Sequence, residues 1–184
     1  MVKVILISGK AQHGKDTFAA MLRVKLRDAG KSVKITHFGD LLKYICKEFF
    51  EWDGRKDEAG RSLLQHVGTE IFRENDPNYW CRFIYEVSQY INTFDYLIVA
   101  DTRFLTEINQ FPEAYKVRVI RIFNEDENYA LNDNQQSHVS ENDLNSYHDW
   151  DYIITARSGD IDKLYEAASR LANKLTEEVT VDGN

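Results

Sequence analysis

The stretch that most constrains the fold is Ile5–Met21, "ILISGKAQHGKDTFAAM". Gly9, Gly14 and Lys15 fit the pattern G-x-x-x-x-G-K, in which a glycine-rich loop and a helix N-terminus bind phosphate through backbone N–H groups. The apolar run before the loop predicts a buried parallel strand, and the residues after it have helical spacing. This strand–loop–helix unit predicts an α/β fold with a phosphate at the end of its first strand. An ordinary glycine-containing turn is the alternative for so short a pattern.

The residue after Lys15 is Asp16, at a position where the pattern has Ser or Thr, and Thr17 comes one step later. A carboxylate is a hard oxygen ligand, so Asp16 is predicted to hold Mg²⁺ directly or through water. The alternative is that Asp16 only caps the helix and Thr17 contacts the phosphate. Lys15 is predicted to reach the outer phosphates of a nucleotide.

The rest of the chain alternates apolar strands with amphipathic helices. Strands are expected at residues 2–8, 32–38, 95–101, 115–123 and 149–155, and helices at 16–29, 40–52 (capped by Asp40), 61–73, 78–92 and 161–175. This alternation predicts an α/β fold with a five-stranded parallel sheet and helices on both faces, of the P-loop NTPase type. We expect a single domain over 1–184, with core segments 1–39, 93–123 and 148–178, a helical acceptor-binding insertion at 40–92 and a lid-like loop at 124–147.

Composition excludes some partners. The formal net charge of −7 argues against stable nucleic-acid binding, which needs a basic face, but permits a local cluster of cations for a small phosphorylated substrate. Cys46 and Cys81 match no metal-binding spacing and are expected to be buried, reduced thiols. The first apolar run is too short for a signal peptide, and no window approaches the roughly 20 apolar residues of a membrane span. We therefore expect a cytoplasmic protein with no membrane partner.

A second carboxylate closes the apolar run "YLIVAD", and Arg103 follows two residues later. An apolar strand that delivers Asp101 beside a phosphate-binding loop is predicted to orient Mg²⁺ and its waters. Arg103 would neutralise charge on the transferred phosphoryl group. The alternative for Asp101 is that it caps the following helix.

Two nucleotide-binding classes are disfavoured. A GTPase needs a guanine-reading N-K-x-D segment, and the nearest string, "NKLT", lacks the Asp. A motor or large ATPase usually needs a longer chain. A small phosphotransferase with a second, acceptor pocket remains.

The insertion at 40–92 supplies polar side chains for that pocket. Arg61, Gln65 and Thr69 follow at i, i+4 and i+8, on one face of the expected helix. Arginine suits a phosphate-bearing acceptor because it donates two parallel hydrogen bonds, an amide can read a base edge, and an aromatic ring can stack on it. The alternatives are solvated surface cations and an aromatic residue in the core. The candidates are Asp40, Lys43, Arg61, Gln65, Thr69, Arg73 and Trp80.

Five segments, in order, resemble the deoxynucleoside monophosphate kinases of bacteriophages and their bacterial relatives, within the P-loop nucleoside monophosphate kinase group. They are "GKAQHGKDT", "FGDLLK", "RSLLQHVGTEIFRENDPNYW", "DYLIVADTR" and "SHVSENDL…DYIIT". The resemblance implies transfer of the γ-phosphoryl group of ATP to a deoxynucleoside monophosphate, with Mg²⁺, giving the diphosphate and ADP. It implies small-molecule nucleotides as partners and leaves a homodimer open.

The resemblance also implies roles for individual residues. Asp101 and Arg103 resemble the acid–base pair between the two nucleotides, and Lys43, Arg61, Gln65, Arg73 and Trp80 resemble the acceptor side. The ATP phosphate loop is implied to be Gly9, Lys10, Gln12, His13, Gly14, Lys15, Asp16 and Thr17.

Two departures from the family pattern affect these implications. The chain is short between Lys43 and Arg61, so base selectivity does not carry over. The loop 124–147 contains no arginine, so Arg121 just before it, His138 within it and Arg157 after the last strand are the remaining candidates to contact the phosphates. Rival interpretations are a kinase of the same fold acting on phosphomevalonate or dephospho-coenzyme A, and an ATP-binding regulator without turnover.

Overall fold

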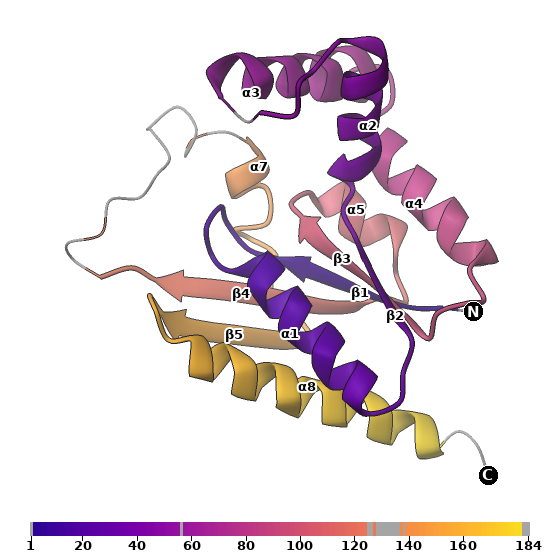
Figure 1. Cartoon of the computed structure of the whole chain (residues 1–184), viewed down its shortest axis with the longest axis vertical. Helices are drawn as coiled ribbons and strands as arrows, with labels where there is room; N and C mark the ends of the chain where they lie inside the picture. Colours follow the sequence, from indigo (N-terminus) through magenta and orange to yellow (C-terminus); the bar gives the residue numbers. More distant parts are fainter. Residues whose placement is uncertain (1, 56, 125–126, 128–136, 138, 182–184) are drawn as a thin grey trace.

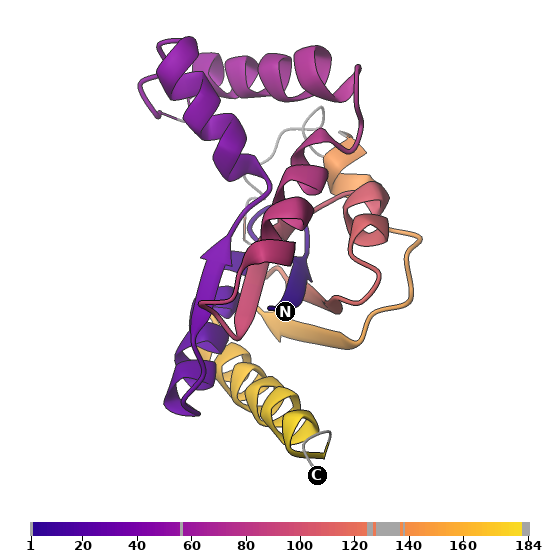
Figure 2. The ribbon, with the colours of Figure 1, turned by 90° about the vertical axis from the view of Figure 1, so that its right-hand side faces the viewer.

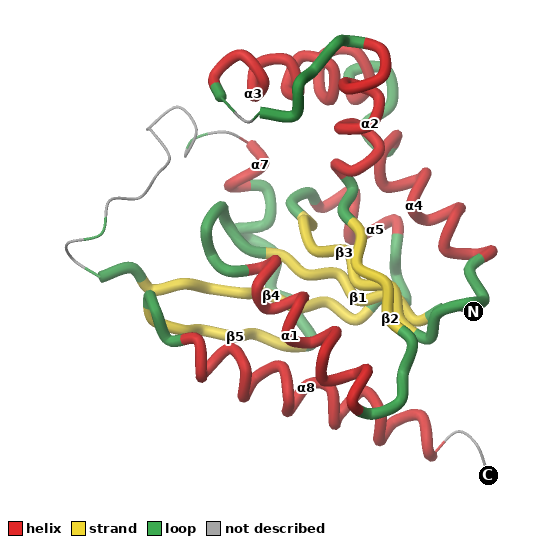
Figure 3. Tube along the Cα trace, in the orientation of Figure 1, coloured by secondary structure: helices red, strands yellow, loops and turns green. Residues whose placement is uncertain are grey.

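The computed structural model of the chain describes residues 2–55, 57–124, 127, 137 and 139–181. Its centre is a parallel sheet of five strands in the order β2-β3-β1-β4-β5 (Figure 3). The strands are β1 Lys3–Ser8, β2 Val33–Thr36, β3 Tyr96–Thr102, β4 Tyr115–Ile122 and β5 Tyr152–Arg157. The predicted five-stranded parallel α/β sheet is confirmed, and each strand falls within or beside its expected range.

Helices cover both faces of the sheet, as the alternation of elements predicts (Figures 1 and 2). On one face, α1 (Lys15–Asp28) and α8 (Ile161–Val181) enclose a core that includes Phe18, Leu22 and Leu171, all fully buried. On the other face, α4 (Tyr79–Tyr90) and α5 (Leu105–Gln110) contribute Trp80 and Ile108 to a second core. Two-sided burial explains why β1 and β3 are almost uninterrupted apolar runs.

The chain leaves neighbouring strands β1 and β3 toward opposite faces. After β1 it enters α1, and after β3 it enters α5, on the other side of the sheet. Ligands of open α/β sheets bind in the crevice that such a divergence opens at the carboxyl ends of the strands. The fold therefore places the loop 9–14 and the residues that follow β3 at one edge.

The insertion forms α2 (Gly39–Phe49), α3 (Glu58–Gln65) and η1 (His66–Arg73), followed by α4. Figure 1 shows α2 and α3 projecting from the sheet at the top of the molecule. Their own small core is Cys46, Trp52 and Val67. Both cysteines are free and buried, as expected.

The helix predicted over 61–73 is two helices. It changes from α to π geometry at His66, and the N–H of Glu74 donates to the carbonyl of Thr69, five residues earlier, at 2.9 Å. Gly68 permits close packing here, since a Cβ at this position would lie 2.7 Å from Leu42 Cδ2. A π-helix has more residues per turn, so the i, i+4, i+8 face predicted for Arg61, Gln65 and Thr69 does not continue past α3.

Two short helices in the described part of the chain were not predicted. The six residues of α5 and the four of α7 (Val139–Asn142) are too few to show a helical period in the sequence. A side-chain acceptor stabilises the start of α5: Glu107 Oε2 accepts from the N–H groups of Arg103 and Phe104, at 2.7 and 3.1 Å.

Candidate active site

The loop between β1 and α1 requires glycine at two positions. At Gly9, a Cβ would lie 2.4 Å from the carbonyl oxygen of Val119 on β4, so no side chain fits there. Gly14 has φ 86° and precedes the first turn of α1, a left-handed conformation that glycine adopts without steric cost. This path presents the N–H groups of the loop at the start of a helix, where the helix dipole also favours an anion.

Lys15 is buried at the centre of the site. Its Nζ donates to the carbonyl of Lys10 at 2.8 Å, and only 7% of the residue is exposed. Burial, and then the positive charge of Arg103, lower the pKa of Lys15 to about 8, while Glu141, Asp16 and Asp101 act in the opposite direction. Two cations and three carboxylates therefore converge within electrostatic range of the loop.

Asp101 joins the end of β3 to the start of α2. Its Oδ1 accepts from the N–H of Phe38 at 2.7 Å, and its Oδ2 from the N–H of Gly39 at 3.1 Å. The prediction that Asp40 caps this helix is wrong. The N-cap residue of α2 is Phe38, whose side chain makes no capping hydrogen bond. Asp101 of β3 accepts from the first N–H groups instead. The alternative of a capping role for Asp101 holds for α2, although the sequence pointed to the helix that follows it.

A chain of polar contacts links the loop to the insertion. His37 Nε2 lies 3.1 Å from Asp16 Oδ1, and its Nδ1 lies 3.1 Å from Asp40 Oδ2. Asp40 Oδ1 in turn accepts from Lys43 Nζ at 2.9 Å. Burial lowers the pKa of His37, but the carboxylates of Asp101, Asp16 and Asp40 outweigh it and the pKa is raised. The predicted loop residue Asp16 and the predicted acceptor residues Asp40 and Lys43 thus lie in one network.

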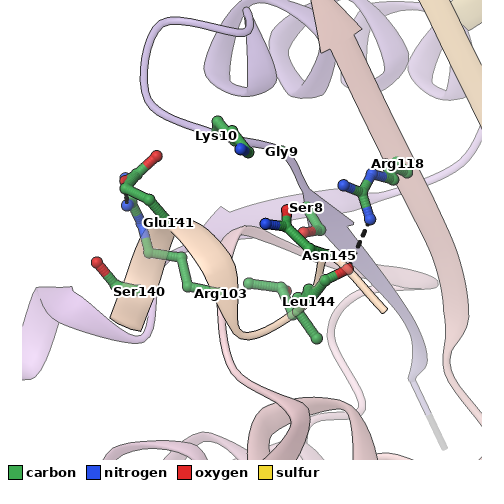
Figure 4. A pocket seen from close by; sticks show the side chains of 10 residues that line it. Ser8, Gly9, Lys10, Arg103, Arg118, Ser140, Glu141, Leu144 and Asn145 are labelled. Atoms are coloured by element: carbon green, nitrogen blue, oxygen red, sulfur yellow. Dashed lines mark hydrogen bonds and ion pairs between the residues drawn. The ribbon is translucent and has the colours of Figure 1, made fainter. Parts of the chain in front are cut away.

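Arg103 pairs with Glu141 of α7, and the other carboxylate oxygen of Glu141 accepts from the N–H of Ala11 at 2.8 Å. The side chain of Glu141 is only 6% exposed. Figure 4 shows these two side chains together beside Gly9 and Lys10 of the loop. Arg103 is therefore next to the glycine-rich loop, where the sequence predicted it.

Arg73 is held by a second buried carboxylate. Its Nη2 donates to Glu107 Oε1 at 2.9 Å, and its guanidinium lies 4.0 Å from the centroid of the Phe104 ring. Because Glu107 also binds the backbone of Arg103, one carboxylate fixes both arginines. Burial raises the pKa of Glu107 to about 7, although Arg73 and the N–H of Arg103 act against it.

A pocket of about 550 Å³ runs along the loop and the start of α8. Arg121 lies on its wall and donates to Ser158 Oγ at 2.7 Å, to Gln12 O at 3.3 Å and to Glu127 Oε1 at 2.7 Å. Burial lowers the pKa of His13, which is also on this wall. Sequence-predicted residues that line the pocket are Gln12, His13, Gly14, Lys15, Asp16, Thr17, Arg121 and Arg157.

Several predicted acceptor residues are not brought to the loop. Trp80 is 2% exposed and donates from Nε1 to the carbonyl of Gly68 at 3.0 Å, within a cluster of aromatic rings. This burial corrects the expectation that Trp80 stacks on a base, since its ring is covered by the protein. Arg61 and Gln65 are exposed on α3, and Thr69 is half-buried in η1. His138 lies outside the described residues.

Sequence reasoning missed His37, Glu107 and Glu141. Glu107 accepts from the N–H of Phe104, as the glutamate of a capping box does, but the sequence lacks the Ser or Thr that marks such a box at the N-cap. Glu141 acts on residues far away in the chain, and of the two contacts of His37 only that with Asp40 is local, so no sequence pattern marks either residue.

Asp16 and Asp101 are suitable for Mg²⁺, because both supply hard carboxylate oxygens near Lys15. Asp16 has an 81% exposed side chain, and each oxygen of Asp101 retains a lone pair beyond its one backbone bond. Within the described ranges there is no cluster of three or more potential His, Cys, Asp or Glu ligands. Magnesium in kinases is bound by one or two carboxylates together with substrate phosphates and water.

Comparison with known proteins adds to this geometry. The family model described as deoxynucleotide monophosphate kinase matches residues 32–168, which include Asp101, Arg103 and Glu141. A phosphomevalonate kinase of Drosophila melanogaster is 27% identical over 120 residues, which cover 62% of this chain and 62% of that protein. The chain thus spans under two thirds of the length of the curated relative it matches. In the described part of the chain, no helix is both long and apolar enough to span a membrane.

Proposed function

Because this chain belongs to the deoxynucleotide monophosphate kinase family, we propose that it transfers the γ-phosphoryl group of ATP to a deoxynucleoside 5′-monophosphate. The products are ADP and the deoxynucleoside diphosphate. The observation that carries the proposal is the pocket of about 550 Å³ along the glycine-rich loop, whose lining includes Lys15. Asp101 and Arg103 lie within electrostatic range of the same lysine. A donor nucleotide fits that pocket, and its outer phosphates then reach Lys15.

In the proposed reaction an oxygen of the acceptor phosphate attacks the γ-phosphorus in line, and the bond to the β-phosphate oxygen breaks. The acceptor phosphate is already anionic near neutral pH, so the protein needs mainly to position the two nucleotides and neutralise charge. Lys15 and Arg103 are the cations proposed to stabilise the transferred group. Mg²⁺, held by Asp16 and Asp101, would supply further positive charge at the donor phosphates.

The donor side is proposed to include Arg121 and Arg157, which line the same pocket as the loop. Arg121 now bonds to Ser158, Gln12 and Glu127, so a bound nucleotide would exchange some of these contacts for phosphate oxygens. On the acceptor side we retain Lys43 and Arg73. Lys43 binds Asp40, which shares His37 with Asp16 of the loop. Arg73 binds Glu107, which also accepts from the N–H of Arg103. Arg61, Gln65 and Thr69 stay predictions.

A second candidate acceptor is phosphomevalonate, because the Drosophila protein that matches this chain is named a phosphomevalonate kinase. The two acceptors share a phosphate monoester and differ in the presence of a base and sugar. Arginines that bind the phosphate suit either compound, so the geometry of these cations does not separate them.

The deciding experiment measures ADP release with ATP and Mg²⁺ against the four deoxynucleoside monophosphates, phosphomevalonate and dephospho-coenzyme A. Selective turnover of one or more deoxynucleotides supports the proposal, and turnover of phosphomevalonate alone replaces it. Binding of ATP without acceptor-dependent ADP release would instead favour a regulator.

Lys15→Ala provides the matched test of mechanism. We expect a loss of about 100-fold or more in turnover with an unchanged circular dichroism spectrum, since a preorganised charge at the transferred group is removed. Lys25→Ala on the same helix is the control, because Lys25 Nζ contacts Tyr165 far from the loop. Equal activity in the Lys15 variant and the control would remove Lys15 from the mechanism.

A further inference from the structure

Glu141 occupies a position where two anion-binding groups of the site converge. One carboxylate oxygen accepts from the N–H of Ala11 in the loop, at 2.8 Å, and the other pairs with the guanidinium of Arg103. These two groups come from segments more than 90 residues apart in sequence, and Glu141 comes from a third segment. A carboxylate that bridges a loop amide and an arginine makes the same contacts that a phosphate group makes.

The surroundings of this carboxylate leave little room for a second anion. The hollow beside it is lined by Gly9, Lys10, Thr102 and Arg103 and has a volume of about 20 Å³. Thr102 is 0% exposed, and its hydroxyl has no hydrogen-bond partner among the described residues. A phosphate that approaches the N–H of Ala11 would therefore have to replace the Glu141 carboxylate, and the Thr102 hydroxyl is a further donor on that side.

We propose that Glu141 is an internal stand-in for phosphate, whose carboxylate holds the Ala11 N–H and Arg103 until a phosphate group of the substrate displaces it. This inference rests on the proposed binding of phosphate by the loop. Glu141 thereby sets the affinity of the site for phosphate, because each binding event breaks its two charge-assisted contacts.

The exchange requires only a side-chain movement. Residues just after Glu141 are attached independently. Asp143 Oδ2 accepts from the N–H of Leu105 at 2.7 Å. The carbonyl of Leu144 accepts from Arg118 Nη1 at 2.7 Å, a bond drawn in Figure 4. With α7 anchored in this way, the Glu141 side chain can rotate off the loop while the backbone stays in place. Arg103 then becomes available to the phosphate.

Isothermal titration of the unmodified protein and a Glu141→Gln variant with sodium pyrophosphate tests the proposal. Loss of one charge-assisted hydrogen bond corresponds to about tenfold in a binding constant, so the variant should bind pyrophosphate about tenfold more tightly. Asp143→Asn is the matched control: it removes one charge in the same segment, its amide oxygen can still accept from Leu105, and its affinity should stay unchanged. Equal or weaker binding by the Glu141→Gln variant overturns the proposal.

A second readout needs no variant. When pyrophosphate is titrated into the unmodified, isotope-labelled protein, displacement should move the amide resonances of Ala11 and Glu141 together, with the same midpoint. A shift of the Ala11 resonance while Glu141 stays unperturbed would also overturn it. The kinase assay is separate: tighter pyrophosphate binding by the variant supports the stand-in even if no deoxynucleotide is phosphorylated.

Discussion

The buried carboxylate of Glu107 should make the stability of this protein depend on pH. Only 2% of the residue is exposed, and it is the shared acceptor for Arg73 and for the backbone of Arg103 and Phe104. Burial raises its pKa from 4.5 to about 7, so between these values the folded protein holds a proton that the unfolded chain releases. Stability due to this group is therefore fully present below about pH 4.5 and is lost as pH rises toward 7.

The size of this effect follows from the two pKa values. At about 1.36 kcal/mol for each pKa unit, raising the pKa from 4.5 to about 7 corresponds to about 3 kcal/mol. A Glu107→Gln variant stays neutral at every pH, so it lacks this dependence. The free energy of unfolding of the unmodified protein, minus that of the variant, should fall by about 2 to 3 kcal/mol between pH 5 and pH 8, less than the full amount because pH 5 already lies half a unit above the pKa of the unfolded chain.

Urea unfolding at pH 5 and pH 8, followed by far-ultraviolet circular dichroism, measures this difference. Glu166→Gln is the control, because Glu166 lies on the exposed face of α8 and its ion pair with Arg170, at 3.4 Å, is screened by solvent. A difference between unmodified protein and Glu107→Gln that is constant across this pH range, or that grows with pH, would refute the reasoning. Glu107 would then be ionised in the folded state throughout.

Three further substitutions test the site and the core. Gly9→Ala should weaken ADP binding at least about tenfold in a titration, since its Cβ would meet the Val119 carbonyl. Gly30→Ala is its control: Gly30 has φ 75° and no neighbour within 4 Å, so the change should lower stability by about 1 kcal/mol and leave the affinity for ADP unchanged. Asp101→Ala should lower the melting temperature by about 4–8 °C, because the start of α2 loses the acceptor of two N–H groups, and should abolish turnover. Trp80→Phe should cost about 1 kcal/mol, through its bond to Gly68, and leave the KM for the acceptor unchanged; a raised KM would return Trp80 to the acceptor site. ADP titration measures the effect of Gly9→Ala, thermal unfolding that of Asp101→Ala, and steady-state kinetics that of Trp80→Phe.

Local patterns in the sequence were sufficient for the frame of this protein. The branched apolar run of β1, the glycines after it and the helical spacing from Phe18 onward each depend on residues within a few positions, and the structure has them where expected. The same kind of pattern placed Asp101 and Arg103 at the end of a strand. The helix at 61–73 was only half predicted: it changes to π geometry at His66, and Gly68 in this part packs closely on Leu42 of another helix, a contact that no local pattern shows.

The pairing of the charged groups was not accessible from the sequence. Glu141 accepts from Ala11 across 130 positions, and Asp101 binds the start of α2 across 63. Trp80 stands in a sequence context that suits a stacking residue equally well, and only its burial in the second core decides its role. For Asp101 the contacts in space show that it caps α2, across 63 positions, while its role toward Mg²⁺ stays a prediction.

The amino-acid order by itself determined the parallel sheet, the glycine loop and the lysine that follows it, since backbone conformation and hydrophobic period are properties of neighbouring residues. The tertiary structure alone decided which carboxylate faces which cation: Glu141 with Arg103, Glu107 with Arg73 and His37 between Asp16 and Asp40. Coulomb energy and desolvation depend on distance and burial, and these are fixed only when segments far apart in the chain pack against one another.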